Sequence, residues 1–507
     1  MILFRLILIV GMLAISTLSV AQEKPNIVFI MADDLGLGDV SYYNEAIQKT
    51  DAIVKTPAID SLAEQGIWFN DAHSATSLCS PTRYCVMSGN MNYRSYAKWG
   101  VWGTFRESPF RPGEATLASV PKSAGYSTAF IGKWHLGGDF RNKKDGSIFR
   151  HHGKLRSDHS VDVSEMVGGG PASLGFDYSL TIPCGIQGPV YTVYENGKWL
   201  PANDESKLVF LTEKNAIHPK IVSDKGPGPG DSHFDTREIG KLISQKASDF
   251  IERQNGSKPF FLCYWSPHVH LPHFPTDEFD GKKIANQTPS RHLDTLLDLD
   301  QQVARIISSL KKANQFDNTL IILTSDNGGL SPKATLKSGH DPSGGYRGFK
   351  NSAFEGGHRV PYIATWPGHI QPGTFCNEPI INQDSLATFA DLLNVALPET
   401  EAMDSLSLLP LLTQEGQYQS RDFFMMQAGS KHEIMFRENG WKLILQSNRE
   451  VSKFEPIGLF NLNSNPTENE SENLVKDPDQ LERIKSMREK YIRIRENGAR
   501  TTPIIQG

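Results

Sequence analysis

The sequence predicts an α/β fold, in which a large, mostly parallel sheet is sandwiched by helices and a smaller C-terminal α+β domain follows. Two continuous apolar runs, at residues 26–32 (NIVFIMA) and 319–325 (TLIILTS), are typical of strands buried on both faces of a parallel sheet. Strand and helix patterns alternate between them, which favours crossover connections within one sheet. After about residue 400 the pattern changes to short strands joined by turns. We therefore expect a large domain at 22–400 and a smaller one at 401–507.

The individual elements follow from local patterns. Residues 56–66 form a helix with a Thr cap, a Pro in the first turn and a terminal Gly, and residues 293–313 form a long amphipathic helix. The same reasoning predicts the remaining elements: strands at 67–70, 127–132 and 259–264, helices at 116–125 and 236–254, then strands at 422–427, 433–437 and 441–446 and a helix at 479–496. The long loops 90–112 and 140–170 are expected to shape a binding site.

Composition excludes several classes of protein. The 507 residues include 52 Lys and Arg against 57 Asp and Glu, a formal net charge of −5. A general nucleic-acid binder needs a basic surface, so we expect no nucleic-acid partner. Hydrophobic residues make up 38% of the chain and charged residues 21%, which is typical of a globular protein rather than a disordered one.

The first 21 residues are predicted to be a cleaved signal peptide. Arg5 precedes an apolar run at 6–13, and Ser19-Val20-Ala21 is a small-x-small cleavage pattern, so Gln22 begins the mature chain. The alternative is a membrane anchor, but the apolar run is short for a span of ~20 residues. The protein is therefore expected to be secreted or periplasmic, with no membrane association after cleavage. The five cysteines, an odd number, do not suggest a disulfide framework.

Carboxylates follow both buried strands. Asp33-Asp34 comes after the first and Asp326-Asn327 after the second. In an open α/β sheet, ligands bind beyond the carboxyl ends of the strands, and such oxygen ligands suit Ca²⁺ or Mg²⁺ rather than Zn²⁺. Taken alone, either pair is more typical of turn and cap residues than of metal ligands.

The segment Cys79-Ser80-Pro81-Thr82-Arg83 is more specific. Cys and Pro are both scarce, so the pattern C-x-P-[ST]-R rarely arises by chance. Pro81 suits the first turn of a helix that ends near Gly89, which places Cys79 just before a helix N-terminus, where negative charge is favoured.

With these segments in view, the chain resembles the type I, formylglycine-dependent sulfatases, which share the alkaline-phosphatase-like fold. The resemblance rests on five motifs in the family's order, which cover most of residues 26–361, and on a C-terminal segment at 458–474. The five are NIVFIMADDLG (26–36), CSPTRYCVMSG (79–89), GKWHLG (132–137), SDNGG (325–329) and FKNSAFEGGHRVP (349–361). Residues 22–400 then correspond to the sulfatase catalytic domain.

The resemblance implies that a maturation enzyme, either a formylglycine-generating or an anaerobic sulfatase-maturating enzyme, oxidises Cys79 to Cα-formylglycine. One hydroxyl of its hydrate attacks the sulfur of a sulfate ester, the alcohol leaves, and the second hydroxyl expels sulfate. A serine would instead form a stable sulfate ester. The implied ligands of one Ca²⁺ ion, with Mg²⁺ less favoured, are Asp33, Asp34, Asp326, Asn327 and the modified Cys79.

The resemblance also implies roles for cationic and imidazole groups. Arg83 steadies the formylglycine hydrate, Lys133 binds sulfate, and His135 takes the proton of the hydrate. Lys133 and His135 are two residues apart, so on an extended segment both would point to one face. His270 before Leu271-Pro272 is expected to contact the leaving group, with His268 as the alternative. Lys350 is expected to be the second sulfate lysine, with Lys337 as the alternative.

The segment 175–188 departs from the family, because some members carry a hydroxyl side chain where this chain has Cys184 and Gly185. Gln187 is a candidate for a polar contact there. The two long loops are rich in aromatic and basic residues, which suit anionic saccharides. They are Tyr93, Arg94, Tyr96, Trp99, Trp102 and Phe105 in one, and His151, His152, Lys154 and Arg156 in the other.

We therefore expect an exported sulfatase, a sulfuric ester hydrolase that acts on sulfated saccharides. The alternatives are an arylsulfatase acting on aryl sulfates, a phosphoester or phosphonate hydrolase of the same superfamily, and a catalytically inactive binding protein.

Overall fold

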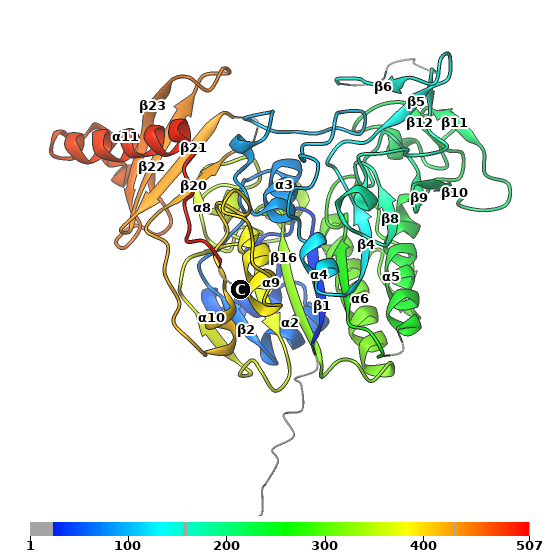
Figure 1. The fold of residues 1–507 in the computed structure, drawn as a ribbon, viewed down its shortest axis with the longest axis horizontal. Coiled ribbons are helices and arrows are strands. Elements are labelled where there is room, and N and C mark those ends of the chain that lie inside the picture. The colour runs from blue at the N-terminus through cyan, green and yellow to red at the C-terminus, as the bar shows by residue number, and fades with distance from the viewer. Residues whose placement is uncertain (1–23, 154, 156–159, 255, 430, 506–507) are drawn as a thin grey trace, which may run out of the picture.

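A computed structural model describes residues 24–153, 155, 160–254, 256–429 and 431–505 (Figure 1). The predicted signal peptide, Lys154 and Arg156 lie outside these residues. Within them, ten strands form the central sheet. Their spatial order is β10 (Lys198–Leu200), β9 (Val193–Glu195), β8 (Tyr178–Ile182), β4 (Ser127–Lys133), β13 (Phe260–Trp265), β1 (Asn26–Ala32), β16 (Thr319–Ser325), β17 (Tyr362–Thr365), β2 (Ile67–Phe69) and β18 (Thr374–Cys376).

The middle of this sheet is parallel. The consecutive neighbours β8, β4, β13, β1 and β16 all pair in parallel, whereas β9, β10 and β17 pair antiparallel with their neighbours. The expected fold class, with its mostly parallel sheet, is confirmed. Ala32 of β1 pairs with Ser325 of β16, so the two strands end side by side.

Helices cover both faces of the sheet. Along β1 the odd residues from Ile27 pack into one apolar core and the even residues from Val28 into another, which explains why the strand is apolar throughout. The first core is covered by α3 (Cys79–Ser88), α4 (Ser119–Ser123) and α9 (Ser385–Leu392). The second is covered by α2 (Pro57–Glu64), α5 (Thr236–Arg253) and α6 (Arg291–Lys312).

A smaller antiparallel sheet follows at one end of the molecule (Figure 1). It consists of β20 (Phe424–Gln427), β21 (Glu433–Glu438), β22 (Trp441–Ser447) and β23 (Phe454–Asn461). Helix α11 (Leu481–Asn497) packs on it through Tyr491, which contacts Phe436 and Phe454. A smaller C-terminal α+β unit is therefore confirmed, while its boundary at residue 400 stays a prediction.

A buried ion network joins the two units. Lys442 of β22 lies 2.9 Å from Glu355 of α8 (Glu355–His358) and 2.8 Å from Glu468, and all three side chains are fully buried. Lys442 also contacts the His358 ring at 3.1 Å, and that ring contacts His73 at 2.9 Å. These groups could hold a metal ion by residue type, but Lys442 and Arg359, which lies 2.9 Å from Glu355, already balance the two carboxylates, so the cluster acts as an ionic connection between the two units.

The remaining elements are short. The loop expected at 140–170 contains a three-stranded sheet of β5 (Phe140–Asn142), β6 (Ile148–Phe149) and β7 (Val161–Asp162). Two-strand pairs are β11 (Leu208–Leu211) with β12 (Gly228–Asp231), β14 (Glu278–Phe279) with β15 (Lys282–Lys283), and β19 (Ile380–Ile381) with β3 (Ala72–His73), and the other short helices are α1 (Ser41–Tyr43), α7 (Lys333–Lys337) and α10 (Leu409–Thr413). Among the described residues, no helix is both long and apolar enough to cross a bilayer.

Candidate active site

The acidic residues expected at the strand ends meet at one edge of the sheet. Asp33 and Asp34 follow β1, Asp326 and Asn327 follow β16, and all four are fully buried. The backbone N–H of Asp34 donates to Asp326 Oδ1 over 3.1 Å, and Asn327 Nδ2 donates to Asp34 Oδ1 over 2.8 Å. Asp34 has a φ of 64°, a left-handed conformation that turns the chain sharply after the strand. The parallel register of β1 and β16 therefore brings these oxygens together.

Two oxygens of this group lack a hydrogen-bond donor among the described residues. Asp33 Oδ1 and Asn327 Oδ1 are both buried and accept no hydrogen bond. Buried polar oxygens without a partner are costly, and a bound cation satisfies them. A set of carboxylate and amide oxygens fits a hard divalent cation such as Ca²⁺ or Mg²⁺.

Cys79 is the first residue of α3 rather than the residue before it. Its sulfur and single ligand atoms of Asp33, Asp34 and His270 all lie within 4.8 Å of one another. Burial raises the pKa of the Cys79 thiol to about 12, although the nearby Lys133 ammonium opposes the shift. Burial therefore disfavours the thiolate form of an unmodified Cys79.

Arg83 lies one helical turn after Cys79 and points back to the same edge. Its Nη2 donates to Asp326 Oδ2 over 2.6 Å and lies 3.7 Å from Asp33 Oδ1. Its Nη1 donates to the carbonyl of Lys133 over 3.1 Å. The guanidinium is fully buried, so these contacts hold it rigidly between the two carboxylates.

Two lysines complete the charge balance. Lys133 Nζ lies 2.5 Å from Asp33 Oδ2, and Lys350 Nζ lies 2.6 Å from Asp34 Oδ1 and 2.8 Å from Asp34 Oδ2. Burial alone would raise the pKa of Asp34, but Lys350 and then His270 lower it overall. The alternative Lys337 is an exposed residue of α7, and nothing places it at this edge.

The pKa of the Asp326 carboxyl is raised to about 6. Burial is the main cause and the neighbouring Asp33 carboxylate adds to it, whereas Arg83 opposes it. Two carboxylates so close together are costly when both are ionised. This repulsion is a second indication that the edge is built to bind positive charge.

The structure separates the two candidate histidines. His270 Nδ1 contacts the carbonyl of Leu271 at 2.7 Å, and its Nε2 lies 3.6 Å from Asp34 Oδ2. His268 is instead held by Gln302 of α6, whose Nε2 lies 3.0 Å from His268 Nδ1. His270 therefore belongs to the site, and His268 belongs to the contact between sheet and helix.

The backbone conformation at His135 differs from the one that we predicted from the sequence. We expected Lys133 and His135 on one extended segment, but His135 has a φ of 57°, so this reason was wrong. Burial lowers the pKa of His135 well below its usual value, and the charges of Lys133 and Arg83 lower it further. Its Nδ1 is buried and has no hydrogen-bond partner among the described residues, which leaves it available to a ligand.

A cavity of about 300 Å³ opens beside His135. We call it the basic pocket. Its lining residues include Thr104, Phe105, Arg106, His135, His151, His152, Cys184, Gln187 and Lys225. From the sequence we expected Gln187, His151 and His152 near the substrate. We did not expect Arg106 and Lys225, which belong to no recognisable motif.

Most of the aromatic loop residues expected around the substrate are packing residues instead. Trp102 is fully buried, and Arg94 lies 2.6 Å from Asp404 in an ion pair. Trp99 stacks on His432, whereas Tyr96 is 54% exposed. Phe105 lines the basic pocket but also packs in a small core with Phe140 and Phe149.

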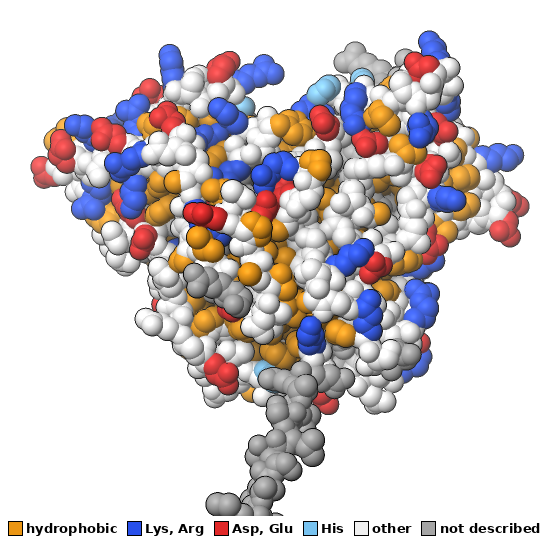
Figure 2. Space-filling view, in the orientation of Figure 1, with side chains coloured by type: hydrophobic (Ala, Val, Ile, Leu, Met, Phe, Trp, Pro, Cys, Tyr) orange, Lys and Arg blue, Asp and Glu red, His pale blue; other side chains and the backbone are white. Residues whose placement is uncertain are grey.

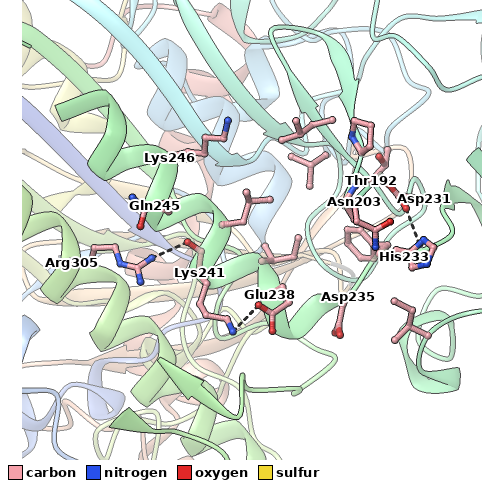
Figure 3. A pocket seen from close by; sticks show the side chains of 18 residues that line it. Thr192, Asn203, Asp231, His233, Asp235, Glu238, Lys241, Gln245, Lys246 and Arg305 are labelled. Atoms are coloured by element: carbon pink, nitrogen blue, oxygen red, sulfur yellow. Dashed lines mark hydrogen bonds and ion pairs between the residues drawn. The ribbon is translucent and has the colours of Figure 1, made fainter. Parts of the chain in front are cut away.

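A second cavity, of about 750 Å³, lies between α5 and the strands β9, β10 and β12 (Figure 3). It includes none of the predicted site residues. Its Lys and Arg side chains are already paired, as Lys241 lies 2.7 Å from Glu238, Lys246 lies 2.8 Å from Glu195, and Arg305 contacts Asp280. This cavity therefore lacks the uncompensated positive charge that a site for an anionic ester requires.

Together, the fold and the site fit a hydrolase whose centre lies beyond the carboxyl ends of parallel strands, with a buried ligand cluster compatible with a metal ion. A family model described as Sulfatase matches residues 25–395, and one described as N-sulphoglucosamine sulphohydrolase, C-terminal, matches residues 345–497. The chain belongs to the sulfatase family and is therefore a sulfuric ester hydrolase.

Individual relatives support this assignment. The chain is 30% identical to an N-acetylgalactosamine-6-O-sulfatase of Bacteroides thetaiotaomicron over 88% of this chain and 89% of that one. It is 30% identical to human steryl-sulfatase over 80% of this chain and 72% of the relative. A solved structure, described under the metabolism of multiple glycosaminoglycans by Bacteroides thetaiotaomicron, has a TM-score of 0.76 at 27% identity, covering 94% of this chain and all of that one.

Proposed function

We propose that the protein is an exported sulfatase that removes sulfate from saccharides, with Cys79 converted to Cα-formylglycine by a maturation enzyme. One observation carries the proposal. Cys79 lies with Asp33, Asp34 and His270 in one buried cluster that also receives cationic side chains from its own helix and from two other segments of the chain. The relative that acts on N-acetylgalactosamine 6-sulfate supports a saccharide substrate.

The residues that would hold the metal are Asp33, Asp34, Asp326 and Asn327, together with the modified Cys79. The unpartnered oxygens of Asp33 and Asn327 support this assignment, and an all-oxygen set favours Ca²⁺. When bound, the cation lowers the proton affinity of the nucleophile and polarises the ester.

Charge balance explains why such a site suits an anionic ester. Three carboxylates and three cationic side chains offset one another in formal charge, so a bound dication leaves the site positive. The cationic groups then hold the ester oxygens and stabilise charge that develops as the bond breaks. These groups are Arg83, Lys133 and Lys350, each with a carboxylate contact at 2.8 Å or less.

The two histidines are assigned to proton transfer and to the leaving group. Burial, and then the charge of Lys133, lower the pKa of His135 well below its usual value, so its neutral ring can accept a proton from the nucleophile. His270 Nδ1 is engaged by the carbonyl of Leu271, which aims Nε2 into the site toward the leaving-group oxygen. His270 is only 6% exposed, whereas His135 is half-buried and lines the basic pocket.

Mass spectrometry of the peptide that contains residues 79–83 tests the modification. The mature protein is expected to carry the aldehyde or its hydrate at position 79, and Cys79→Ala is expected to release no sulfate. Cys79→Ser provides a matched control, because it keeps an oxygen nucleophile but cannot expel sulfate. We expect it to liberate one equivalent of alcohol and then stop. Full sulfate release by either variant would refute the proposal.

The substrate class is tested by comparing sulfated saccharides with nitrophenyl sulfate and nitrophenyl phosphate. Release of sulfate from saccharides but not from the aryl ester supports the proposal. The reverse pattern would identify an arylsulfatase, a reading that the steryl-sulfatase and arylsulfatase relatives keep open. Preference for the phosphate would identify a phosphoester hydrolase instead.

A further inference from the structure

The basic pocket differs in charge from the rest of the surface. Figure 2 shows that acidic and basic side chains are intermingled over the visible face of the molecule. By contrast, the described residues that line the basic pocket include Arg106, Lys225 and three histidines but no Asp or Glu. A cavity with this lining has a positive potential, because its low-dielectric walls concentrate the field of the two cations.

Arg106 has no carboxylate partner in the part of the chain that the structure describes. Its guanidinium instead contacts the Nδ1 atom of His152, which faces the same cavity. A histidine ring carries no negative charge, so this contact leaves the positive charge of Arg106 uncompensated. Lys225 is only loosely paired, since its Nζ lies 3.7 Å from Asp224 and its side chain is 44% exposed. Both cations are therefore available to an anion that enters the cavity.

Gln187 gives an independent indication that the cavity binds a polar ligand. Its side chain is only 5% exposed, and its Oε1 is buried without a hydrogen-bond partner among the described residues. Such a buried carbonyl oxygen is costly unless a ligand or water donates to it. A sugar hydroxyl is a suitable donor, and the same amide offers N–H groups to a second hydroxyl.

His135 connects the basic pocket to the candidate active site. It lines the pocket, and it lies close enough to the metal-binding edge that the positive charges of Lys133 and Arg83 lower the pKa of its ring. A sugar ring in the pocket would therefore direct one substituent toward Cys79 while its other substituents face Arg106 and Lys225.

From this arrangement we infer that the preferred substrate carries a second anionic group, in addition to the sulfate ester that is cleaved. Arg106 and Lys225 bind this group, which is either the carboxylate of a linked uronic acid or a second sulfate. The inference rests on the proposed function, because it places the saccharide of that reaction in the basic pocket.

The test compares three substrates: a monosulfated neutral saccharide, the same sulfated sugar linked to a uronic acid, and a disulfated sugar. For the wild type, kcat/KM is expected to be higher for at least one doubly anionic substrate than for the neutral one. In Arg106→Met and Lys225→Met, the ratio of doubly to singly anionic kcat/KM is expected to fall about tenfold, as lost charge-assisted contacts at a partly exposed site imply. Whichever doubly anionic substrate loses its advantage identifies the second anion.

Lys241→Met is the matched control, because Lys241 lines the cavity of Figure 3 and pairs with Glu238. It should leave the ratio unchanged. An equal loss in this control, or an unchanged ratio in both Arg106→Met and Lys225→Met, would overturn the inference.

Direct binding separates this inference from the proposed function. The Cys79→Ala protein is titrated with each saccharide by calorimetry, with and without Arg106→Met. Tighter binding of a doubly anionic saccharide that requires Arg106 supports the inference even if no saccharide is hydrolysed. If saccharides are hydrolysed but bind with the same affinity in both proteins, the inference fails and the proposed function stands.

Discussion

The replacement Lys350→Met tests the charge arrangement of the site. The ammonium of Lys350 contacts both oxygens of Asp34, at 2.6 and 2.8 Å, and its side chain is 11% exposed. Methionine has a similar length and removes only the charge and the donors. We expect kcat to fall ~10²- to 10³-fold, which corresponds to about 2.7–4 kcal/mol for one preorganised donor aimed at developing charge.

The same replacement has a stability effect that can be measured without substrate. Lys350 is the largest influence that lowers the pKa of Asp34, so its loss leaves a buried carboxylate less compensated. In metal-free protein this costs about 3–5 kcal/mol, as for a broken buried ion pair. Adding Ca²⁺ is expected to recover part of the loss, because the cation replaces the missing positive charge. Urea unfolding with and without Ca²⁺ measures both quantities.

Lys337→Met is the control for this experiment, since Lys337 was the alternative lysine and is exposed on α7. It should keep both kcat and stability within the small range of surface substitutions. The reasoning is refuted if Lys350→Met keeps kcat within threefold of the wild type, or if Lys337→Met causes the larger loss.

Four other predictions follow from the same structure. Burial and nearby cations hold the pKa values of His135 and His270 well below 6.5, so we expect the plot of kcat against pH to show no imidazole titration near pH 6.5. A step near 6.5 that disappears in either His→Ala variant would contradict this. Ca²⁺ at about 100 times its Kd should stabilise the protein against unfolding by about 2.7 kcal/mol. Asn327→Leu should weaken the Ca²⁺ dependence of Tm, and a variant with the wild-type dependence would exclude Asn327 as a ligand. Lys442→Met should destabilise the protein by about 3–5 kcal/mol in urea unfolding, because it leaves two buried carboxylates without their shared cation, and a loss below about 1 kcal/mol would argue against the ion network. Burial raises the pKa of Asp300 to about 7, so the contribution of this carboxyl to stability is complete below its unfolded pKa of 3.8 and is lost as pH rises through 7, by up to about 4 kcal/mol. Asp300→Asn should remove this part of the pH dependence of stability, and an unchanged pH profile in the variant would contradict the assignment.

Local sequence patterns predicted the elements that depend on burial alone. The strands at 26–32 and 319–325 were predicted with their observed limits, because a strand covered on both faces must be apolar throughout. Helix α4 was predicted too long, at 116–125 against Ser119–Ser123. Strand β23 was not predicted, because Pro456 and Gly458 lower its strand propensity. Proline is tolerated in β23 because this strand lies at the edge of the small sheet.

The sequence by itself determined the family, because the residues of each motif are close to one another along the chain and carry their chemistry in their type. Only the tertiary structure places His270 rather than His268, and Lys350 rather than Lys337, beside Asp34, since each placement depends on which element lies opposite the side chain. It also brought Arg106 and Lys225 together across 119 residues of chain. Long-range packing, rather than local pattern, therefore shaped the pocket that we propose for the substrate.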